Sequence, residues 1–428
     1  MRYKAISKEL FEVNRKNFCS SMTENSLAIF CSNDQMPTNS DGTMPFKQNS
    51  DLFWLSGVDQ EESKLILFPE CSNPNHREIL FLKETSELIA IWEGAKLTKE
   101  QAFETSGVRT VYWNSDFEKV FDTLMAEAQN VYFNSNDHSR ATSEVETQTD
   151  RFNSWCKSKY NDKNYIKSAP KLHELRALKH PIEIDLLQHA CNITEKGFRR
   201  VLDFVKPGVM EYEIEAEYMH EFLINRSKGF AYEPIIASGR NACVLHYIDN
   251  NKKCQDGDVI LMDVGAEYAN YASDMTRCIP VNGRFTKRQK DVYNAVLRVM
   301  KEATNMLVPG TMLNDYHQEV GKVMQSELLG LGLIDQHDID KQDPKNPAYR
   351  KYFMHGTSHY LGLDVHDVGH WDTPIQEGMV FTCEPGIYIL EENLGIRIEN
   401  DLVITKDKPF DLMANIPIEV EDIENLMN

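Results

Sequence analysis

The segments Val259-Ile-Leu-Met-Asp-Val-Gly-Ala-Glu267 and Tyr271-Ala-Ser-Asp-Met-Thr-Arg-Cys-Ile-Pro280 decide the fold of the second half of this chain. Both read as β-strands, and the short connection between them predicts an antiparallel hairpin. A hairpin centred between residues 268 and 269 places Asp263 directly opposite Asp274, with Cβ atoms about 5 Å apart. Two carboxylates at this distance repel each other, so in an apolar setting they share a proton or bind a cation. A divalent metal satisfies both, and water-exposed turn aspartates are the ordinary alternative.

A second hairpin of the same kind is expected nearer the C-terminus. Gly378-Met-Val-Phe-Thr-Cys-Glu-Pro-Gly-Ile-Tyr-Ile389 and Gly395-Ile-Arg-Ile-Glu-Asn-Asp-Leu-Val-Ile404 are joined by a five-residue connection. One register puts Glu384 opposite Glu399, and the next puts them diagonally adjacent on one face. Arg397 shares that face, so its guanidinium is predicted to orient the Glu399 carboxylate. A plain surface ion pair is the alternative, and the apolar flanks favour burial.

Three histidines fall within twelve positions, at 355, 359 and 366. The helical zinc-protease motif His-Glu-x-x-His is excluded, because Gly356 stands where the general-base glutamate is required. One neutral imidazole completes a carboxylate-rich metal site well, and the spacing alone does not choose among the three. The others, together with His246, are candidates to hydrogen-bond a substrate, although a lone His246 is more often structural.

The composition is that of a globular protein with more than one domain. The chain has 428 residues, and no apolar run approaches the ~18 residues of a membrane span. Its 46 basic and 66 acidic side chains leave a formal charge of −20, which argues against nucleic acid and anionic membranes as partners. Residues 1–22 lack the apolar core of a secretory signal, and the nine scattered cysteines suit reduced thiols. We therefore expect a cytoplasmic protein.

The first part of the chain alternates short strand and helix patterns. Glu78-Ile-Leu-Phe-Leu-Lys83 and Asn130-Val-Tyr-Phe-Asn134 are typical of its strands. These patterns predict a small α/β domain over residues 1–171. The polar stretch at residues 147–171 is interpreted as the boundary.

The second domain, residues 172–428, contains a repeated pattern. A helix is predicted from Pro181 to about residue 205. Val205-Lys-Pro-Gly-Val-Met-Glu211 follows it, and Leu307-Val-Pro-Gly-Thr-Met-Leu313 occupies the same place between two later helical stretches. Each copy continues to a histidine-bearing segment and a pair of strands with two acidic residues, which indicates an internal duplication.

Taken in order, these motifs resemble the aminopeptidase P and prolidase family of metallopeptidases. The resemblance covers residues 172–405 and is carried by the motifs Leu261-Met-Asp-Val-Gly-Ala-Glu-Tyr-Ala-Asn-Tyr-Ala-Ser-Asp-Met-Thr-Arg277, His355 to Val368, Thr382-Cys-Glu-Pro-Gly-Ile-Tyr388 and Gly395-Ile-Arg-Ile-Glu-Asn400. Ser50-Asp-Leu-Phe-Trp-Leu-Ser-Gly57 is similar to the family's N-terminal domain, and Ile91-Trp-Glu-Gly94 to its tryptophan-bearing strand. The resemblance implies an α/β protein in which a small N-terminal domain precedes a duplicated pita-bread catalytic domain.

The same resemblance implies two divalent metal ions and their ligands. Asp263 is implied to bind one metal, and Asp274 and Glu399 to bridge both. His359 and Glu384 are implied to bind the other metal, and Glu384 also to manage the proton of the nucleophile. A set of four carboxylates and one imidazole favours Mn2+, with Zn2+ and Co2+ as alternatives.

Further residues are implied to serve the substrate. Arg397 supports the metal ligands, and Trp92 is implied to reach the active site of a neighbouring subunit in a dimer or tetramer. A half-buried strand tryptophan is an equally ordinary interpretation of Trp92. The side chains expected around the substrate are His246, His355, His366 and Tyr388.

The function predicted from these observations is that of an Xaa-Pro aminopeptidase. Such an enzyme hydrolyses the bond between an N-terminal residue and a following proline, with a metal-bridging hydroxide as the nucleophile. His366 or His246 is expected to donate a hydrogen bond to the oxyanion or to the departing proline nitrogen. A prolidase, which cleaves only dipeptides, is not separated from this prediction by the sequence. A metal-free binding module on the same fold and a creatinase-like hydrolase are further alternatives, which the complete ligand set disfavours.

Overall fold

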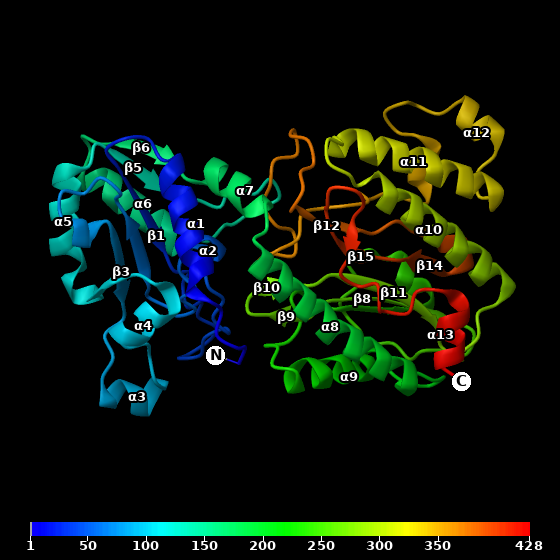
Figure 1. The fold of residues 1–428 in the computed structure, drawn as a ribbon. Coiled ribbons are helices and arrows are strands. Elements are labelled where there is room, and N and C mark those ends of the chain that lie inside the picture. Colours follow the sequence, from blue (N-terminus) through cyan, green and yellow to red (C-terminus); the bar gives the residue numbers. More distant parts are fainter. Residues whose placement is uncertain (1) are drawn as a thin grey trace. The chain divides into compact units, whose positions relative to one another are not determined.

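The computed structural model describes residues 2–428, which form two compact units (Figure 1). One unit is Ala5–Arg176, and the other is Ala177–Asn428 together with the N-terminal residues through Lys4. Residues 147–171, predicted to be a polar boundary, instead contain the helix α6 (Gln148–Lys159) and the strand β6 (Asn164–Lys167) of the first unit. Thr147 caps this helix by accepting a hydrogen bond from the Asp150 amide, so the polar composition marks a capped helix. Among residues 2–428 no helix is long and apolar enough to cross a lipid bilayer.

The N-terminal unit is an α/β domain built on one mixed sheet, in the order β4-β3-β2-β1-β5-β6. The strands predicted around residues 78–83 and 130–134 are confirmed as β3 and β5. Besides β6, the strands are β1 (Ser26–Cys31), β2 (Lys64–Leu67), β3 (Glu78–Leu82), β4 (Thr110–Trp113) and β5 (Asn130–Phe133). Besides α6, the helices are α1 (Lys8–Ser21), α2 (Ser50–Ser56), α3 (Glu87–Glu93), α4 (Lys99–Ser106), α5 (Phe117–Glu127) and α7 (Ala169–Ala177).

Both faces of this sheet are covered by helices. Alternate residues of β1 point to opposite faces, so Leu27 and Ile29 pack with Phe121 of α5, whereas Phe30 contacts Phe18 of α1 with ring centroids 5.4 Å apart. All six residues of β1 are therefore buried, as expected for a central strand between two layers.

The segment that contains Trp92 is a helix, and the prediction of a strand there is wrong. Ser86 accepts a hydrogen bond from the amide of Ile89 and so caps α3, and Gly94 ends the helix with φ 83°. These two local signals at its ends account for the helix.

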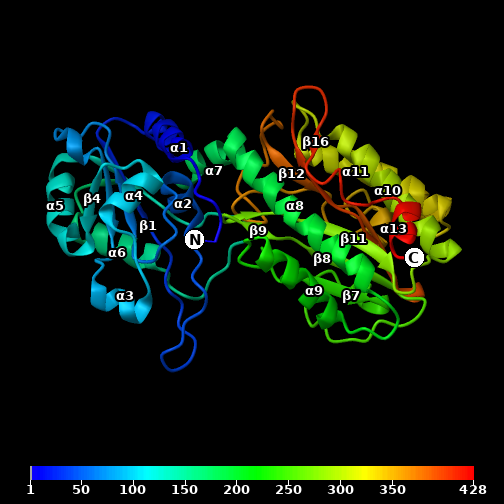
Figure 2. The same cartoon turned by 60° about the horizontal axis from the view of Figure 1, so that its bottom comes forward.

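In the C-terminal unit, two helix pairs lie on opposite sides of a layer of short strands (Figures 1 and 2). The predicted helix from Pro181 and the two Pro-Gly turns are confirmed, and Gly208 and Gly310 occupy equivalent turns with φ 101° and 93°. This repetition agrees with the predicted internal duplication. The helices are α8 (Pro181–Phe204), α9 (Glu211–Ile224), α10 (Lys287–Met306), α11 (Leu313–Gly330), α12 (Gln336–Asp340) and α13 (Val420–Leu426).

The strands of this unit form small antiparallel sheets that adjoin one another, with orders β11-β8-β7, β10-β9, β12-β15-β16 and β13-β14. The first group is β7 (Ile235–Ser238), β8 (Val259–Val264), β9 (Glu267–Tyr268), β10 (Tyr271–Ala272) and β11 (Met275–Pro280). The second group is β12 (Val380–Cys383), β13 (Gly386–Ile389), β14 (Leu394–Arg397), β15 (Asn400–Val403) and β16 (Phe410–Asp411). Strand β14 packs against β8 and β11, which brings the two predicted hairpins together.

The first hairpin exists, but its register differs from the prediction by one residue at the turn. Ala269 and Asn270 have φ 55° and 68°, which is the two-residue turn that suits the twist of a hairpin. Asp263 consequently pairs with Thr276, and Asp274 lies diagonal to Asp263 rather than opposite it. The expectation of directly opposed aspartates is wrong, although both still belong to one face of the hairpin.

The second hairpin follows one of the two predicted registers. Gly386 pairs with Arg397, and Cys383 pairs with Asn400, so the same register runs through both halves of the hairpin. Glu384 and Glu399 lie between these pairs and therefore face each other. The pairing of the two strands is interrupted at Pro385, because proline has no amide hydrogen to donate to the β-ladder.

Candidate metal centre

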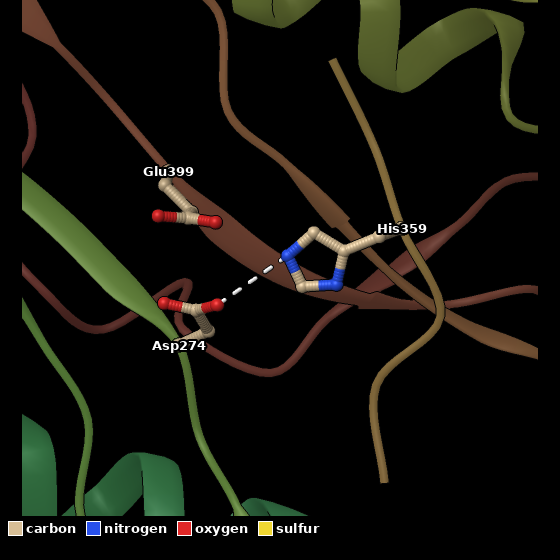
Figure 3. A group of neighbouring side chains, drawn as sticks. All are labelled: Asp274, His359 and Glu399. Carbon is tan, nitrogen blue, oxygen red and sulfur yellow. Dashed lines mark ion pairs between the residues drawn. The ribbon is translucent and has the colours of Figure 1, made fainter. Parts of the chain in front are cut away.

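Three buried side chains from distant parts of the chain form the centre of the candidate site (Figure 3). Asp274 precedes β11, Glu399 lies between β14 and β15, and His359 belongs to the loop before β12. Each offers one ligand atom, and these atoms lie within 4.8 Å of one another. All three residues are buried, so the cluster is not a chance grouping of surface acids.

Asp263 and Glu384 extend this group to all five predicted ligands. The Nε2 atom of His359 is 3.5 Å from Asp274 Oδ2 and 3.6 Å from Glu384 Oε1. The hydroxyl of Tyr232 lies 2.7 Å from Asp263 Oδ1 and 2.6 Å from Asp274 Oδ1, so it links the two aspartates. The structure thus brings together the five residues that the sequence motifs singled out.

Hydrogen bonds from their own amides hold the acidic residues in place. The amide of Glu399 donates to Thr276 O at 3.1 Å, and the amide of Glu384 donates to Thr357 O at 2.8 Å. The amide of Asp274 donates to the buried Asp401 carboxylate at 3.0 Å. Each of these acidic side chains is therefore fixed through its own main chain.

The carboxylates of this site are costly to ionise in the absence of a cation. Burial, with the charge of Asp274 and of Asp263, raises the pKa of Glu384 to about 7. Burial and the charges of Asp274 and Glu384 raise the pKa of Glu399 well above its ordinary value. Burial acts to lower the pKa of His359, but its hydrogen bond with Asp274 and the charge of Glu384 raise it to about 9. Without metal, these groups keep protons that reduce the repulsion among the carboxylates. A bound metal ion would replace those protons.

The donor set fits a divalent metal. Asp274, His359 and Glu399 offer ligand atoms to one centre, and Asp263 and Glu384 adjoin this group. Oxygen-rich sets of this kind suit divalent cations such as Mn2+. The single phenol hydrogen of Tyr232 can serve only one of its two aspartate neighbours at a time. The other carboxylate then lacks a hydrogen bond from this hydroxyl, and a bound cation would neutralise its charge.

Arg397 contacts the cluster at Asp263 and, through Thr276, at Glu399. Its Nη2 atom pairs with the carboxylate of Asp263, and its Nε atom donates to Thr276 Oγ1 at 3.0 Å. Thr276 in turn donates to Glu399 Oε2 at 2.7 Å, so this hydroxyl links Arg397 to Glu399, and the charge of Arg397 also acts on that carboxylate. Residue 397 pairs with β13, and its side chain reaches Asp263 of β8 and Thr276 of β11.

The other predicted histidines lie beside the cluster. His355 contacts Tyr388 through Nε2 at 2.7 Å and lies 3.7 Å from Glu384 through Nδ1. Burial and the neighbouring Arg397 lower the pKa of His355 to about 3, so this imidazole is neutral. The ring of His366 lies 4.5 Å from that of His359, edge to face.

His246 and Trp92 complete the predicted residues. His246 is exposed and lies close enough to His355 for its charge to affect that imidazole. Trp92 belongs to the N-terminal unit, where its side chain is 82% exposed on α3, and its part in a substrate site stays a prediction.

Sequence reasoning missed three residues of the site: Tyr232, Thr276 and Asp401. Thr276 lies two residues after Asp274, so strand periodicity places both on one face and offered a signal. Tyr232 lies in an irregular segment before β7, and no local pattern connects it with either aspartate.

Comparison with known proteins identifies the class to which this fold and site belong. The model of metallopeptidase family M24 matches residues 185–406, and that of the aminopeptidase P N-terminal domain matches residues 11–132. The chain is 35% identical to an Xaa-Pro aminopeptidase of Haemophilus influenzae and 34% identical to one of Escherichia coli, and each alignment covers 99% of this chain and 98% of the relative. The structure of Escherichia coli aminopeptidase P in complex with substrate superposes with a TM-score of 0.89 at 33% identity and covers 99% of both chains.

This chain therefore belongs to metallopeptidase family M24. Its N-terminal unit contains the aminopeptidase P N-terminal domain, and its C-terminal unit has the predicted pita-bread fold. The predicted family and fold are both confirmed.

Proposed function

We propose that this chain is an Xaa-Pro aminopeptidase, a metal-dependent hydrolase that removes the N-terminal residue from peptides with proline in the second position. The observation that carries the proposal is the convergence of Asp263, Asp274, His359, Glu384 and Glu399 on one buried centre. Full-length similarity to Xaa-Pro aminopeptidases supports the choice of substrate.

We infer that these five residues would hold two divalent ions, with Asp274 and Glu399 contributing to both sites. Bound ions of this kind polarise a carbonyl and lower the pKa of a water ligand, so that hydrolysis proceeds near neutral pH. The four carboxylates favour Mn2+, and Zn2+ and Co2+ are the alternatives to compare. Elemental analysis of the active enzyme should find two ions per chain, and one ion per chain contradicts this count.

The residues around the ligands have separate tasks in this proposal. Glu384 accepts and returns the proton of the nucleophile, as the family resemblance implies. His366 or His246 donates a hydrogen bond to the oxyanion or to the departing proline nitrogen. His355 stays neutral and holds Tyr388 at the edge of the site, and Arg397 holds Asp263.

The test of this proposal is hydrolysis of an Xaa-Pro tripeptide by the enzyme with and without a chelator. Release of the N-terminal amino acid should stop on chelation and return with Mn2+. An Xaa-Ala tripeptide of the same length is the control and should be cleaved far more slowly. Failure to cleave the Xaa-Pro tripeptide under any metal contradicts the proposed function.

A prolidase is the alternative that the same experiment separates. Prolidases cleave only dipeptides, so an Xaa-Pro dipeptide is assayed beside the tripeptide. Cleavage of the dipeptide alone would assign this chain to the prolidases.

We further propose that the chain forms a homo-oligomer in which Trp92 meets a second copy. Leu88, Ile91 and Trp92 recur at helical spacing on α3 and are 65%, 77% and 82% exposed, which forms an apolar strip without a covering element in its own unit. Sedimentation of the wild type and of Trp92→Ala should give different masses. Equal masses contradict a role for Trp92 in assembly.

A further inference from the structure

Glu211 is a fully buried carboxylate outside the metal cluster, at the first position of α9. No lysine, arginine or histidine side chain of the described residues forms an ion pair with it. A buried carboxylate in that position is stable only when its oxygens are well hydrogen-bonded. The groups that donate hydrogen bonds to the Glu211 carboxylate therefore indicate its role.

All of these donors come from one connection, residues 238–252, which leads from the end of β7 toward β8. The Oε1 atom of Glu211 accepts from the amide of Ser238 at 2.8 Å, from its hydroxyl at 2.7 Å and from Asn241 at 3.4 Å. The Oε2 atom accepts from the hydroxyl of Tyr247 at 2.7 Å and from the amide of Lys252 at 2.9 Å. One carboxylate thus fastens the start, the middle and the end of this loop.

This loop carries His246, the residue directly before Tyr247. Tyr247 is 8% exposed and points to Glu211, whereas its neighbour His246 is exposed and lies near His355. Gly395 of β14 leaves room for the same loop, because a Cβ there would lie 2.1 Å from Ala242 O. The loop is therefore held between α9 and the strand that also carries Arg397.

We propose that Glu211 is a positioning residue of the peptidase: through the hydroxyl of Tyr247 it fixes the loop that presents His246 to the substrate. This inference rests on the proposed function for its kinetic consequence and on the contacts above for its structural one. Glu211 is fully buried, so in this proposal it acts through the loop.

The variant that tests this inference is Tyr247→Phe, which deletes one hydroxyl and keeps the shape of the ring. The four enzymes to compare are the wild type, Tyr247→Phe, His246→Ala and the double variant. A displaced catalytic group costs up to about 10²-fold, so we expect Tyr247→Phe to lower kcat/KM for an Xaa-Pro tripeptide by about 10-fold to 100-fold. In the His246→Ala background the same change should cost less than about 3-fold, because the group that it positions is already gone.

A matched control is Tyr293→Phe, which removes another buried tyrosine hydroxyl in the same unit, one that donates to Ile418 O at 2.8 Å. This control should leave kcat/KM unchanged even if it lowers the melting temperature. Equal losses from Tyr247→Phe with and without His246 would overturn the proposal, because the hydroxyl would then act independently of that histidine.

Hydrogen exchange separates a failure of this inference from a failure of the proposed function. If the wild type cleaves no Xaa-Pro peptide, the loop contacts are still tested by deuterium uptake of residues 239–252. Tyr247→Phe should raise uptake in that segment, and Tyr293→Phe should not. Unchanged uptake in Tyr247→Phe would overturn the inference whatever the activity.

Discussion

Glu384→Gln tests whether the ligand cluster destabilises the protein when no metal is bound. Burial raises the pKa of Glu384 from 4.5 to about 7. A carboxyl group with a higher pKa in the folded protein binds more protons there than in the unfolded chain, so stability is lost as the pH rises from 4.5 to about 7. The difference between the two pKa values corresponds to about 3 kcal/mol above that range.

Glutamine has the shape of the protonated glutamate but cannot ionise. In chelator at pH 8, Glu384→Gln should therefore be more stable than the wild type by up to about 3 kcal/mol, or roughly 6 to 12 °C in Tm. At pH 5 the two proteins should differ by less than about 1 kcal/mol, because the wild-type carboxyl group is then mostly protonated. Thermal unfolding of both metal-free proteins at the two pH values measures this difference.

Added Mn2+ should reverse the order of stability, because glutamine gives up a charged ligand. A metal at a thousand times its Kd stabilises the protein that binds it by about 4 kcal/mol. Glu392→Gln is the matched control, since the hydrogen bond from Arg288 lowers the pKa of Glu392 and the change should not stabilise the protein. A metal-free Glu384→Gln variant that is no more stable than the wild type at pH 8 would show that the ionised Glu384 carboxylate does not destabilise the protein.

Four further substitutions test other parts of the site. Asp274→Asn should lose metal, because the proposed site has this carboxylate bind both ions. Full occupancy by elemental analysis would contradict that role. His366→Ala should lower kcat by about 10² to 10³-fold while metal content stays near normal; equal loss of both would show that it is needed for metal binding. Tyr232→Phe should weaken metal binding by about 10 to 100-fold, measured by chelator competition, because both aspartates lose their hydroxyl partner. Gly265→Ala should destabilise the protein by at least about 1 to 3 kcal/mol in urea unfolding, because its Cβ would lie 1.7 Å from Ser273 O; unchanged stability would contradict this close approach.

Local pattern was sufficient for much of the fold. Strand β3, helix α8 and the paired Pro-Gly turns follow from residue periodicity and turn chemistry, which act within a few positions. Predictions from local composition were wrong where capping residues at the ends of a segment favour a helix. Residues 147–171 are polar but contain a capped helix, and Trp92 lies in a capped helix rather than a strand.

The registers of the two hairpins that carry the site were predicted with different success. The register of the second hairpin was among the predicted ones, whereas the first differed by one residue because Ala269 joins Asn270 in the left-handed conformation. The predicted centre placed Tyr268 and Ala269 in the turn, whereas the left-handed conformation suits asparagine and therefore favours the turn that contains Asn270.

The types and order of the five candidate metal ligands could be read from the sequence, because two acidic hairpins and a histidine-bearing loop follow one another in one linear pattern. Which of these groups meet in space depends on the tertiary structure. Arg397 pairs with Asp263, Tyr232 links two aspartates, and Glu211 fastens the loop of His246. The physical reason is that such contacts depend on how separate sheets and helices pack, which residue periodicity within one segment does not specify.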